Sequence, residues 1–157
     1  MPPAFIVDPK EIDISHIVAG PDDIRKYNPH RFEVEQVHAI LRYDTENQIC
    51  IGLRHIRPDE WWCAGHIPGR PIFPGVLMCE YAAQTCSYYF MRSTGFNGFL
   101  GFGGLENVKF RGTVVPGDDF VMVTKVVEIR PRRAVFNCQG FVKDQMAYQG
   151  TILGMAV

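Results

Sequence analysis

Apolar and polar residues alternate along much of the chain with the period of two that is typical of half-buried β-strands. The stretch RFEVEQVHAILRYD at 31–44 follows this pattern, and after the turn DTENQ a second strand is predicted over 49–57. Later turn signals stand at 115–118, 130–133 and 143–145. They separate four further β-type runs, which read LENVKFRG, DDFVMVTKVVEIR, AVFNCQGFVK and MAYQGTILGMAV.

One segment has a different pattern, that of a buried helix. From about Pro74 to Met91 the residues are apolar on most sides, and Pro74 suits the first helical position. A long irregular segment rich in proline and glycine precedes it at 58–75, and a glycine-rich loop is predicted after it at 93–104. A short helix is predicted at 21–28. One long buried helix among five or six antiparallel strands predicts an α+β fold with the sheet wrapped around the helix.

Composition narrows the classes of function. A length of 157 residues is most simply one domain, and a formal net charge of −1 gives no overall attraction to nucleic acid or to an anionic membrane. We expect no signal peptide, because the N-terminus lacks a basic region followed by an apolar one. No run of apolar residues is long enough for a membrane span. These features together predict a cytoplasmic protein.

The five cysteines show neither a CxxC pair nor a Cys/His spacing that suits zinc. We therefore expect no disulfide framework, no metal site and reduced thiols. Cys63 or Cys79 could serve as a nucleophile, although buried structural thiols are the more common case.

His66 is the first candidate for chemistry. Glycines and prolines on both sides of it give the backbone a defined, irregular path, which can fix an imidazole toward a pocket. A neutral imidazole is the side chain best matched to general-base work near neutral pH. The structural alternative is a loop histidine that only forms local hydrogen bonds.

Glu80 is the second candidate, in the second turn of the predicted helix. Its neighbours are mostly apolar, which predicts a buried carboxyl group. Burial disfavours the charged form of a carboxyl group, and an uncharged carboxyl group suits a general acid. Gln84 lies one turn further along and is placed to orient the carboxyl group of Glu80.

The helix start supplies a third group. Gly75 allows a ligand to approach the backbone closely, and the N–H groups of Gly75 and Val76 would point outward at the positive end of the helix dipole. They would form an oxyanion site for a carbonyl oxygen, although any well-made helix start has similar groups. A base, an acid and an oxyanion site within fifteen residues indicate β-elimination next to a carbonyl group.

The stretch GHIPGRPIFPGVLMCEYAAQ at 65–84 resembles the signature of the β-hydroxyacyl-acyl-carrier-protein dehydratases of the FabZ type, GHFPxxPxxPGVLxxEAxAQ. The resemblance continues in NPHRF at 28–32, in ENVKFRGTVVPGD at 106–118 and in about the last forty residues. It implies a hot-dog fold, in which an antiparallel sheet wraps around one long central helix. It also implies a single domain over 1–157, with residues 1–20 as an N-terminal arm.

For the site, the resemblance implies that His66 is the base and Glu80 the acid in the dehydration of (3R)-hydroxyacyl thioesters to trans-2-enoyl thioesters. The substrate would be carried on the phosphopantetheine arm of acyl carrier protein in fatty acid biosynthesis, without a metal or redox cofactor. In the family, the histidine of one chain meets the glutamate of the other in a homodimer, and a trimer of dimers is common. The N–H of Gly75 would polarise the thioester carbonyl.

Two further groups of residues follow from the resemblance. Aromatic side chains are candidates for the wall of an acyl tunnel, although ordinary core positions remain open for each of them: Phe73, Tyr88, Phe99 and Phe102. Basic side chains at one turn are candidates for docking the acidic carrier, against the alternative of a solvated hairpin turn: Arg130, Arg132 and Arg133.

Three positions depart from the family signature. Ile67 stands where phenylalanine is usual, Arg70 where a second histidine is common, and Tyr81 where alanine is usual, which would add bulk near the acid. Because of these departures, the sequence does not determine the preferred acyl chain length. It also leaves open whether the substrate is a coenzyme A thioester and whether the protein acts in a specialised pathway. Glu80 itself favours plain dehydration, because the related class that also isomerises the double bond has aspartate there. A hot-dog acyl-thioesterase and a non-catalytic acyl-binding subunit remain as alternatives.

Overall fold

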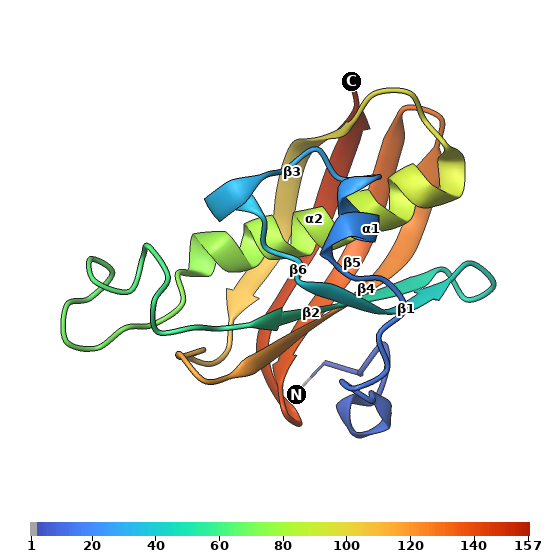
Figure 1. Cartoon of the computed structure of the whole chain (residues 1–157). Helices are drawn as coiled ribbons and strands as arrows, with labels where there is room; N and C mark the ends of the chain where they lie inside the picture. The colour runs from blue at the N-terminus through green and yellow to red at the C-terminus, as the bar shows by residue number, and fades with distance from the viewer. Residues whose placement is uncertain (1–2) are drawn as a thin grey trace.

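A computed structural model describes residues 3–157, so the first two residues of the expected N-terminal arm lie outside the described part. Three short helices, one long helix and six strands make up the fold (Figure 1). In chain order they are η1 (Pro9–Glu11), α1 (Pro21–Arg25), η2 (Phe32–Val34), β1 (Ala39–Asp44), β2 (Ile49–His55), α2 (Gly75–Thr94), β3 (Leu100–Phe110), β4 (Asp119–Arg130), β5 (Arg133–Val142) and β6 (Gln145–Ala156).

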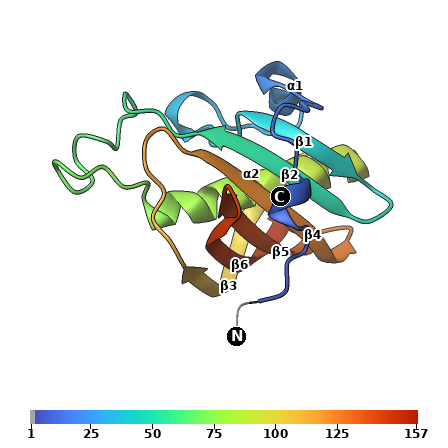
Figure 2. The ribbon, with the colours of Figure 1, turned by 90° about the horizontal axis from the view of Figure 1, so that it is seen from below.

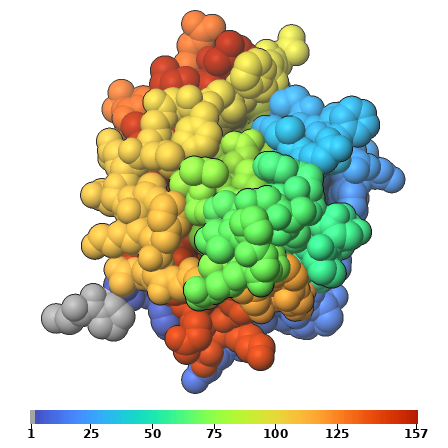
Figure 3. Space-filling view, turned by 90° about the vertical axis from the view of Figure 1, so that its left-hand side faces the viewer, coloured from blue at the N-terminus to red at the C-terminus, as the bar shows by residue number. Residues whose placement is uncertain are grey.

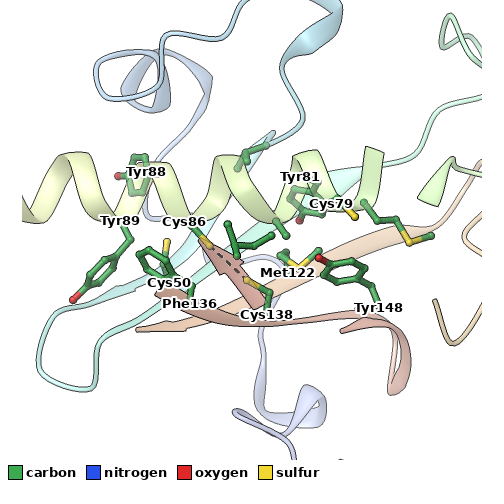
Figure 4. Packing of buried hydrophobic residues seen from close by; sticks show 14 of the residues in the cluster. Cys50, Cys79, Tyr81, Cys86, Tyr88, Tyr89, Met122, Phe136, Cys138 and Tyr148 are labelled. Atoms are coloured by element: carbon green, nitrogen blue, oxygen red, sulfur yellow. Dashed lines mark hydrogen bonds between the residues drawn. The ribbon is translucent and has the colours of Figure 1, made fainter. Parts of the chain in front are cut away.

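The six strands form one antiparallel sheet in the order β1-β2-β4-β5-β6-β3. Helix α2 lies along the concave face, and the sheet curves around it (Figures 1 and 2). Between them lies the main core, where Cys86 of α2 faces Cys138 of β5 and Tyr81 lies near Met122 (Figure 4). This is the hot-dog fold, as the resemblance implied.

A second apolar cluster lies on the outer, convex face of the sheet. It contains Leu41, Ile51, Val123 and Phe141, and the N-terminal arm covers part of it with Val7. The arm is also held by the side chain of buried Gln139, which accepts a hydrogen bond from the Ile6 N–H at 2.9 Å and donates one to the Ala4 carbonyl at 2.9 Å. The arm therefore shields apolar surface that the sheet would otherwise expose.

The predicted strand over 31–44 is wrong in its first half, because regular pairing begins only at Ala39. Phe32 has a positive φ of 56° and is 84% exposed, so the chain forms a 3₁₀ turn there instead of a strand. The polar Gln36 is buried here, and its backbone N–H donates to the Gln84 side chain at 2.8 Å. Phe32 and Val34 thus face outward, the opposite of what their alternation indicated, whereas Val37 reaches the core.

The predicted loop over 93–104 is also shorter than expected. Helix α2 continues to Thr94 and ends at Gly95, which adopts the left-handed conformation and donates its N–H to the Met91 carbonyl. Strand β3 then begins at Leu100, inside the glycine-rich run. Glycine is required at least at Gly103, because a Cβ atom there would lie 2.9 Å from the Met155 side chain.

Tyr81 lies in the core and not beside the acid, contrary to the expectation from the sequence. Its side chain is fully buried, its ring meets the Phe120 ring edge-on at 5.4 Å, and its hydroxyl donates to the Phe120 carbonyl at 2.7 Å. Tyr81 therefore links α2 to β4.

We expect Tyr81→Phe to lower the free energy of unfolding by about 1 kcal/mol, because the buried carbonyl loses one hydrogen-bond donor. Urea denaturation measures this change. Tyr89→Phe is the matched control, since Tyr89 is also buried on α2 and its hydroxyl forms no hydrogen bond within residues 3–157. An equal loss in both variants would contradict the role of the Tyr81 hydroxyl.

Candidate active site

The long segment before α2 carries His66 in a fixed position. The backbone N–H of His66 donates to the Trp62 carbonyl at 2.8 Å, and its ring Nδ1 lies 2.7 Å from the Ile72 carbonyl oxygen. Because a carbonyl oxygen only accepts, Nδ1 must carry the proton, and in the neutral ring Nε2 keeps its lone pair. The hydrogen bond thus orients the imidazole with Nε2 available as a base.

The turn after His66 is strained. Ile67 has a positive φ of 58°, a rare conformation for a β-branched residue, and Gly69 follows with φ of 80°. The Arg70 N–H closes the turn by donating to the Ile67 carbonyl at 2.9 Å. Two of the three departures from the family signature, Ile67 and Arg70, therefore lie in this turn, where Arg70 is exposed.

The start of α2 lies next to His66. Pro74 is the N-cap residue and not the first helical residue as predicted; its carbonyl accepts the N–H groups of Leu77 and Met78 at 3.0 and 3.2 Å. Gly75 and Val76 are then the first two helical residues, whose N–H groups have no acceptor within an α-helix. A Cβ atom at Gly75 would lie 3.0 Å from the Phe110 ring, so glycine permits close packing against β3.

His66, Gly75 and Val76 line one hollow of about 560 Å³, together with Phe73 and Phe110. We call it the His66 hollow. On this side of the molecule the segment that carries His66 (green) lies beside β3 and the chain that follows it (yellow; Figure 3). The candidate base and the candidate oxyanion site thus face the same space.

Glu80 lines a different hollow of about 140 Å³, which we call the Glu80 hollow; its wall includes Phe99 and Phe102. The side chain of Glu80 is 31% exposed, so it is less buried than its apolar neighbours in the sequence predicted. Its Oε1 accepts a hydrogen bond at 2.9 Å from Nε2 of Gln84, one helical turn away. Within one chain, His66 and Glu80 therefore line separate hollows.

His30 is a polar residue of the site that the sequence reasoning missed. Its Nε2 lies 3.7 Å from Oε1 of Glu80, and it lines the Glu80 hollow with Ser87. Burial lowers the pKa of His30, and the negative charge of Glu80 opposes that shift in part. His30 belongs to the element NPHRF, so the resemblance contained the signal, but no role was assigned to it.

The four aromatic tunnel candidates fall into two groups. Phe99 and Phe102 line the Glu80 hollow and are partly exposed. Phe73 borders the His66 hollow, but its ring is buried against Trp62 at 5.5 Å. Tyr88 is buried in the core, where its hydroxyl accepts a hydrogen bond from Arg92.

The three arginines proposed for carrier docking lie at the turn between β4 and β5. Arg130 and Arg133 both form ion pairs with Glu128, at 2.6 and 3.3 Å, and all three arginines are exposed. Arg133 pairs with Met155 of β6, which pairs with Gly101 at the start of β3. The turn therefore lies at the end of the sheet where α2 ends, away from the His66 hollow (Figure 1).

Of the two cysteines considered as nucleophiles, Cys79 is buried and does not suit that role, while Cys63 is half-buried and its thiol donates to the Arg57 carbonyl at 3.4 Å. Burial raises the pKa of the Cys50, Cys79 and Cys86 thiols, which disfavours the reactive thiolate form. Within residues 3–157 no group of three His, Cys, Asp or Glu side chains is arranged to hold a metal ion. No helix in that same range is long and apolar enough to cross a membrane.

A family model described as the FabA-like domain matches residues 28–151. The chain belongs to this family. A 3-hydroxyacyl-[acyl-carrier-protein] dehydratase FabZ from Moorella thermoacetica is 32% identical over 126 residues, which cover 80% of this chain and 87% of that protein. The FabZ dehydratase of Rhizobium rhizogenes is 35% identical over 138 residues, 86% of each chain.

Solved structures show the same fold at low identity. A chain of the dehydratase heterocomplex ApeI:P from Xenorhabdus doucetiae has a TM-score of 0.73 at 10% identity, with 85% of this chain and 90% of that chain covered. The PaaI protein of Escherichia coli, from the phenylacetic acid degradation operon, has a TM-score of 0.58 at 12% identity, with 74% of this chain and 80% of that chain covered.

The part of this FabA-like chain that matches the family includes His30, His66 and Glu80, together with Gln84. The N-terminal arm lies outside it and packs on the outer face of the sheet. All candidate groups of the site thus lie in the FabA-like part.

Proposed function

We propose that the protein dehydrates (3R)-hydroxyacyl thioesters to trans-2-enoyl thioesters on the phosphopantetheine arm of acyl carrier protein, as a step of fatty acid biosynthesis. The hydrogen bond from His66 Nδ1 to the Ile72 carbonyl carries this proposal, because it fixes the ring with Nε2 free to accept a proton. Membership of the FabA-like family and the similarity to FabZ dehydratases support the reaction class.

The proposed reaction is a β-elimination. His66 Nε2 takes the α-proton, and the N–H groups of Gly75 and Val76 stabilise the negative charge that develops on the thioester oxygen. Glu80 then gives its proton to the departing β-hydroxyl group, the carbon–oxygen bond breaks, and water leaves as the double bond forms. One proton is taken and one is given, with no net oxidation or reduction.

The proposal includes a homodimer, in which His66 of one chain and Glu80 of the partner subunit face the same substrate. The separate hollows of His66 and Glu80 in one chain support this arrangement. The exposed edge strand β3 carries apolar side chains such as Leu105 and Phe110, and Val76 on α2 is 76% exposed. A second copy would cover this apolar surface. The arginines near the β4–β5 turn are the proposed docking surface for the acidic carrier.

The test is a panel of trans-2-enoyl thioesters of several lengths, each offered on acyl carrier protein and on coenzyme A. We expect the purified protein to hydrate them, faster on the carrier, as followed by loss of the enoyl absorbance. Release of free thiol without hydration would favour a thioesterase and overturn the proposal. Tight acyl binding without turnover would also overturn it, in favour of an acyl-binding subunit.

A further inference from the structure

Buried polar groups form a continuous chain from Glu80 toward the segment that carries His66. The side-chain amide of Gln84 donates to Glu80 Oε1 at 2.9 Å, and its oxygen accepts the backbone N–H of Gln36 at 2.8 Å. The side-chain oxygen of Gln36 in turn accepts from Nε of Arg54 at 3.0 Å. Gln36, Arg54 and Gln84 are each at most 2% exposed, so water does not compete for the hydrogen bonds that join these three residues.

Arg54, on β2, is the centre of this chain. Both terminal nitrogens of its guanidinium group bind the carboxylate of Glu60, and the group lies 4.6 Å from the centre of the Phe73 ring. The Glu60 carboxylate also accepts the backbone N–H of Arg57 at 2.8 Å and the indole N–H of Trp62 at 3.2 Å. Arg54 thus fixes both the beginning and the end of the irregular segment before α2.

Glu60 stays ionised in this environment. Burial alone would raise the pKa of its carboxyl group, but the hydrogen bonds from Arg54 and from the Arg57 N–H outweigh it, and the pKa is lowered. Buried ion pairs contribute little net stability on average, whereas a fully hydrogen-bonded one restricts its surroundings to one geometry. Holding a geometry is therefore the effect that this pair is best suited to produce.

The two groups that orient His66 both belong to residues tied to Arg54. The carbonyl that accepts the His66 N–H is that of Trp62, whose indole N–H is held by Glu60. The carbonyl that accepts from His66 Nδ1 is that of Ile72. Ile72 directly precedes Phe73, and the guanidinium group of Arg54 lies over the Phe73 ring. The Trp62 and Phe73 rings also pack against each other at 5.5 Å.

We propose that Arg54 is a positioning residue for both candidate catalytic groups: it holds the His66 segment through Glu60 and Phe73, and Glu80 through Gln36 and Gln84. The kinetic part of this inference rests on the proposed dehydratase function. Arg54 touches neither His66 nor Glu80, so its effect is on their placement. A displacement of about 1 Å in a catalytic group can cost about a hundredfold in rate.

The first test compares steady-state hydration of an enoyl thioester by the wild type, Arg54→Met and Arg54→Lys. We expect Arg54→Met to lower kcat about 10- to 100-fold and to change KM less than about threefold, because substrate binding does not involve Arg54. Arg54→Lys keeps the positive charge but not the planar guanidinium group, so its kcat should lie between those of the wild type and of Arg54→Met. The matched control is Arg57→Met, which keeps the backbone N–H that binds Glu60 and removes only a guanidinium group that pairs with Asp59 on the surface; it should leave kcat unchanged.

Loss of Arg54 also leaves the Glu60 charge buried without its partner, which will destabilise the fold. The double variant Arg54→Met/Glu60→Gln removes that charge while keeping an acceptor for Trp62. We expect its thermal stability to recover relative to Arg54→Met, with kcat still reduced about 10-fold or more. Recovery of kcat together with stability would overturn the positioning role.

A second readout needs no turnover. Long-range ¹H–¹⁵N spectra of the ring nitrogens, with the His66 signals assigned from a His66→Asn variant, report the tautomer of His66. We expect the Nδ1–H form in the wild type and in Arg57→Met, and a mixture of tautomers in Arg54→Met and in the double variant. An unchanged tautomer there would overturn the inference about Arg54. A shifted tautomer in a protein without any turnover would support it and overturn the proposed function alone.

Discussion

His66→Ala is expected to lower kcat for hydration of an enoyl thioester by about a thousandfold or more, because the α-carbon loses the group that takes its proton in dehydration and returns it in hydration. The backbone N–H of His66 still donates to the Trp62 carbonyl in this variant, so the segment keeps that anchor. Steady-state rates measure the loss, and thermal unfolding checks that the variant is folded. KM should change little, since the imidazole transfers the α-proton and does not bind the acyl chain.

The variant His66→Asn removes the proposed base but keeps a donor for the hydrogen bond to Ile72. The asparagine amide can still donate to the Ile72 carbonyl, but it has no lone pair that accepts a proton near neutral pH. We expect it to be as inactive as His66→Ala, and substantial activity would contradict the role of base. His16→Ala, at an exposed histidine of the N-terminal arm, is the control and should behave as the wild type.

The central helix and the later strands could be predicted because their patterns come from local burial. Helix α2 was expected over about 74–91 and is found over Gly75–Thr94. Strands β4 and β5 lie within one residue of their predicted ends at each terminus. In these elements the burial of each residue follows its own periodicity, so a window of sequence contains the necessary information.

The failures have a common physical cause, which is contact between segments far apart in the chain. Gln36 is buried because Gln84 and Arg54 supply its partners from α2 and β2, and this outweighs the apolar character of Phe32. Glycine-rich β3 pairs as a strand because β6 approaches it closely, as at Gly103. The alternation of apolar and polar residues within a segment contains no information about such distant partners.

The candidate site shows the same division. The placement of His66 and Gly75 around one hollow follows from sequence neighbours, and the motif contained it. The approach of His30 to Glu80 joins residues fifty positions apart. The hydrogen bonds of Arg54 join β2 to the segment before α2 through Glu60, and to α2 itself through Gln36. The motif therefore indicates the candidate groups, whereas tertiary contacts determine what holds them.

Glu80→Gln is expected to lower kcat about 100- to 10,000-fold, because the amide cannot give a proton to the departing hydroxyl group. The side chain keeps its size, and its oxygen can still accept the hydrogen bond from Gln84. The loss in kcat/KM should be the same for dehydration of a 3-hydroxyacyl thioester and for hydration of the enoyl product, since both directions share one transition state and one equilibrium constant. Glu33→Gln, at an exposed position outside the site, is the control.

Pairing the two inactive variants tests where the site is assembled. In a heterodimer of His66→Ala and Glu80→Gln chains, a site shared across a two-fold interface combines both mutations in one copy and both native residues in the other. Free exchange makes half of the dimers heterodimers, so co-expression should restore about a quarter of wild-type activity. A site contained in one chain restores none, because every chain carries one mutation. Absence of recovery in dimers that exchange subunits would therefore contradict the shared site, even if both single variants are inactive.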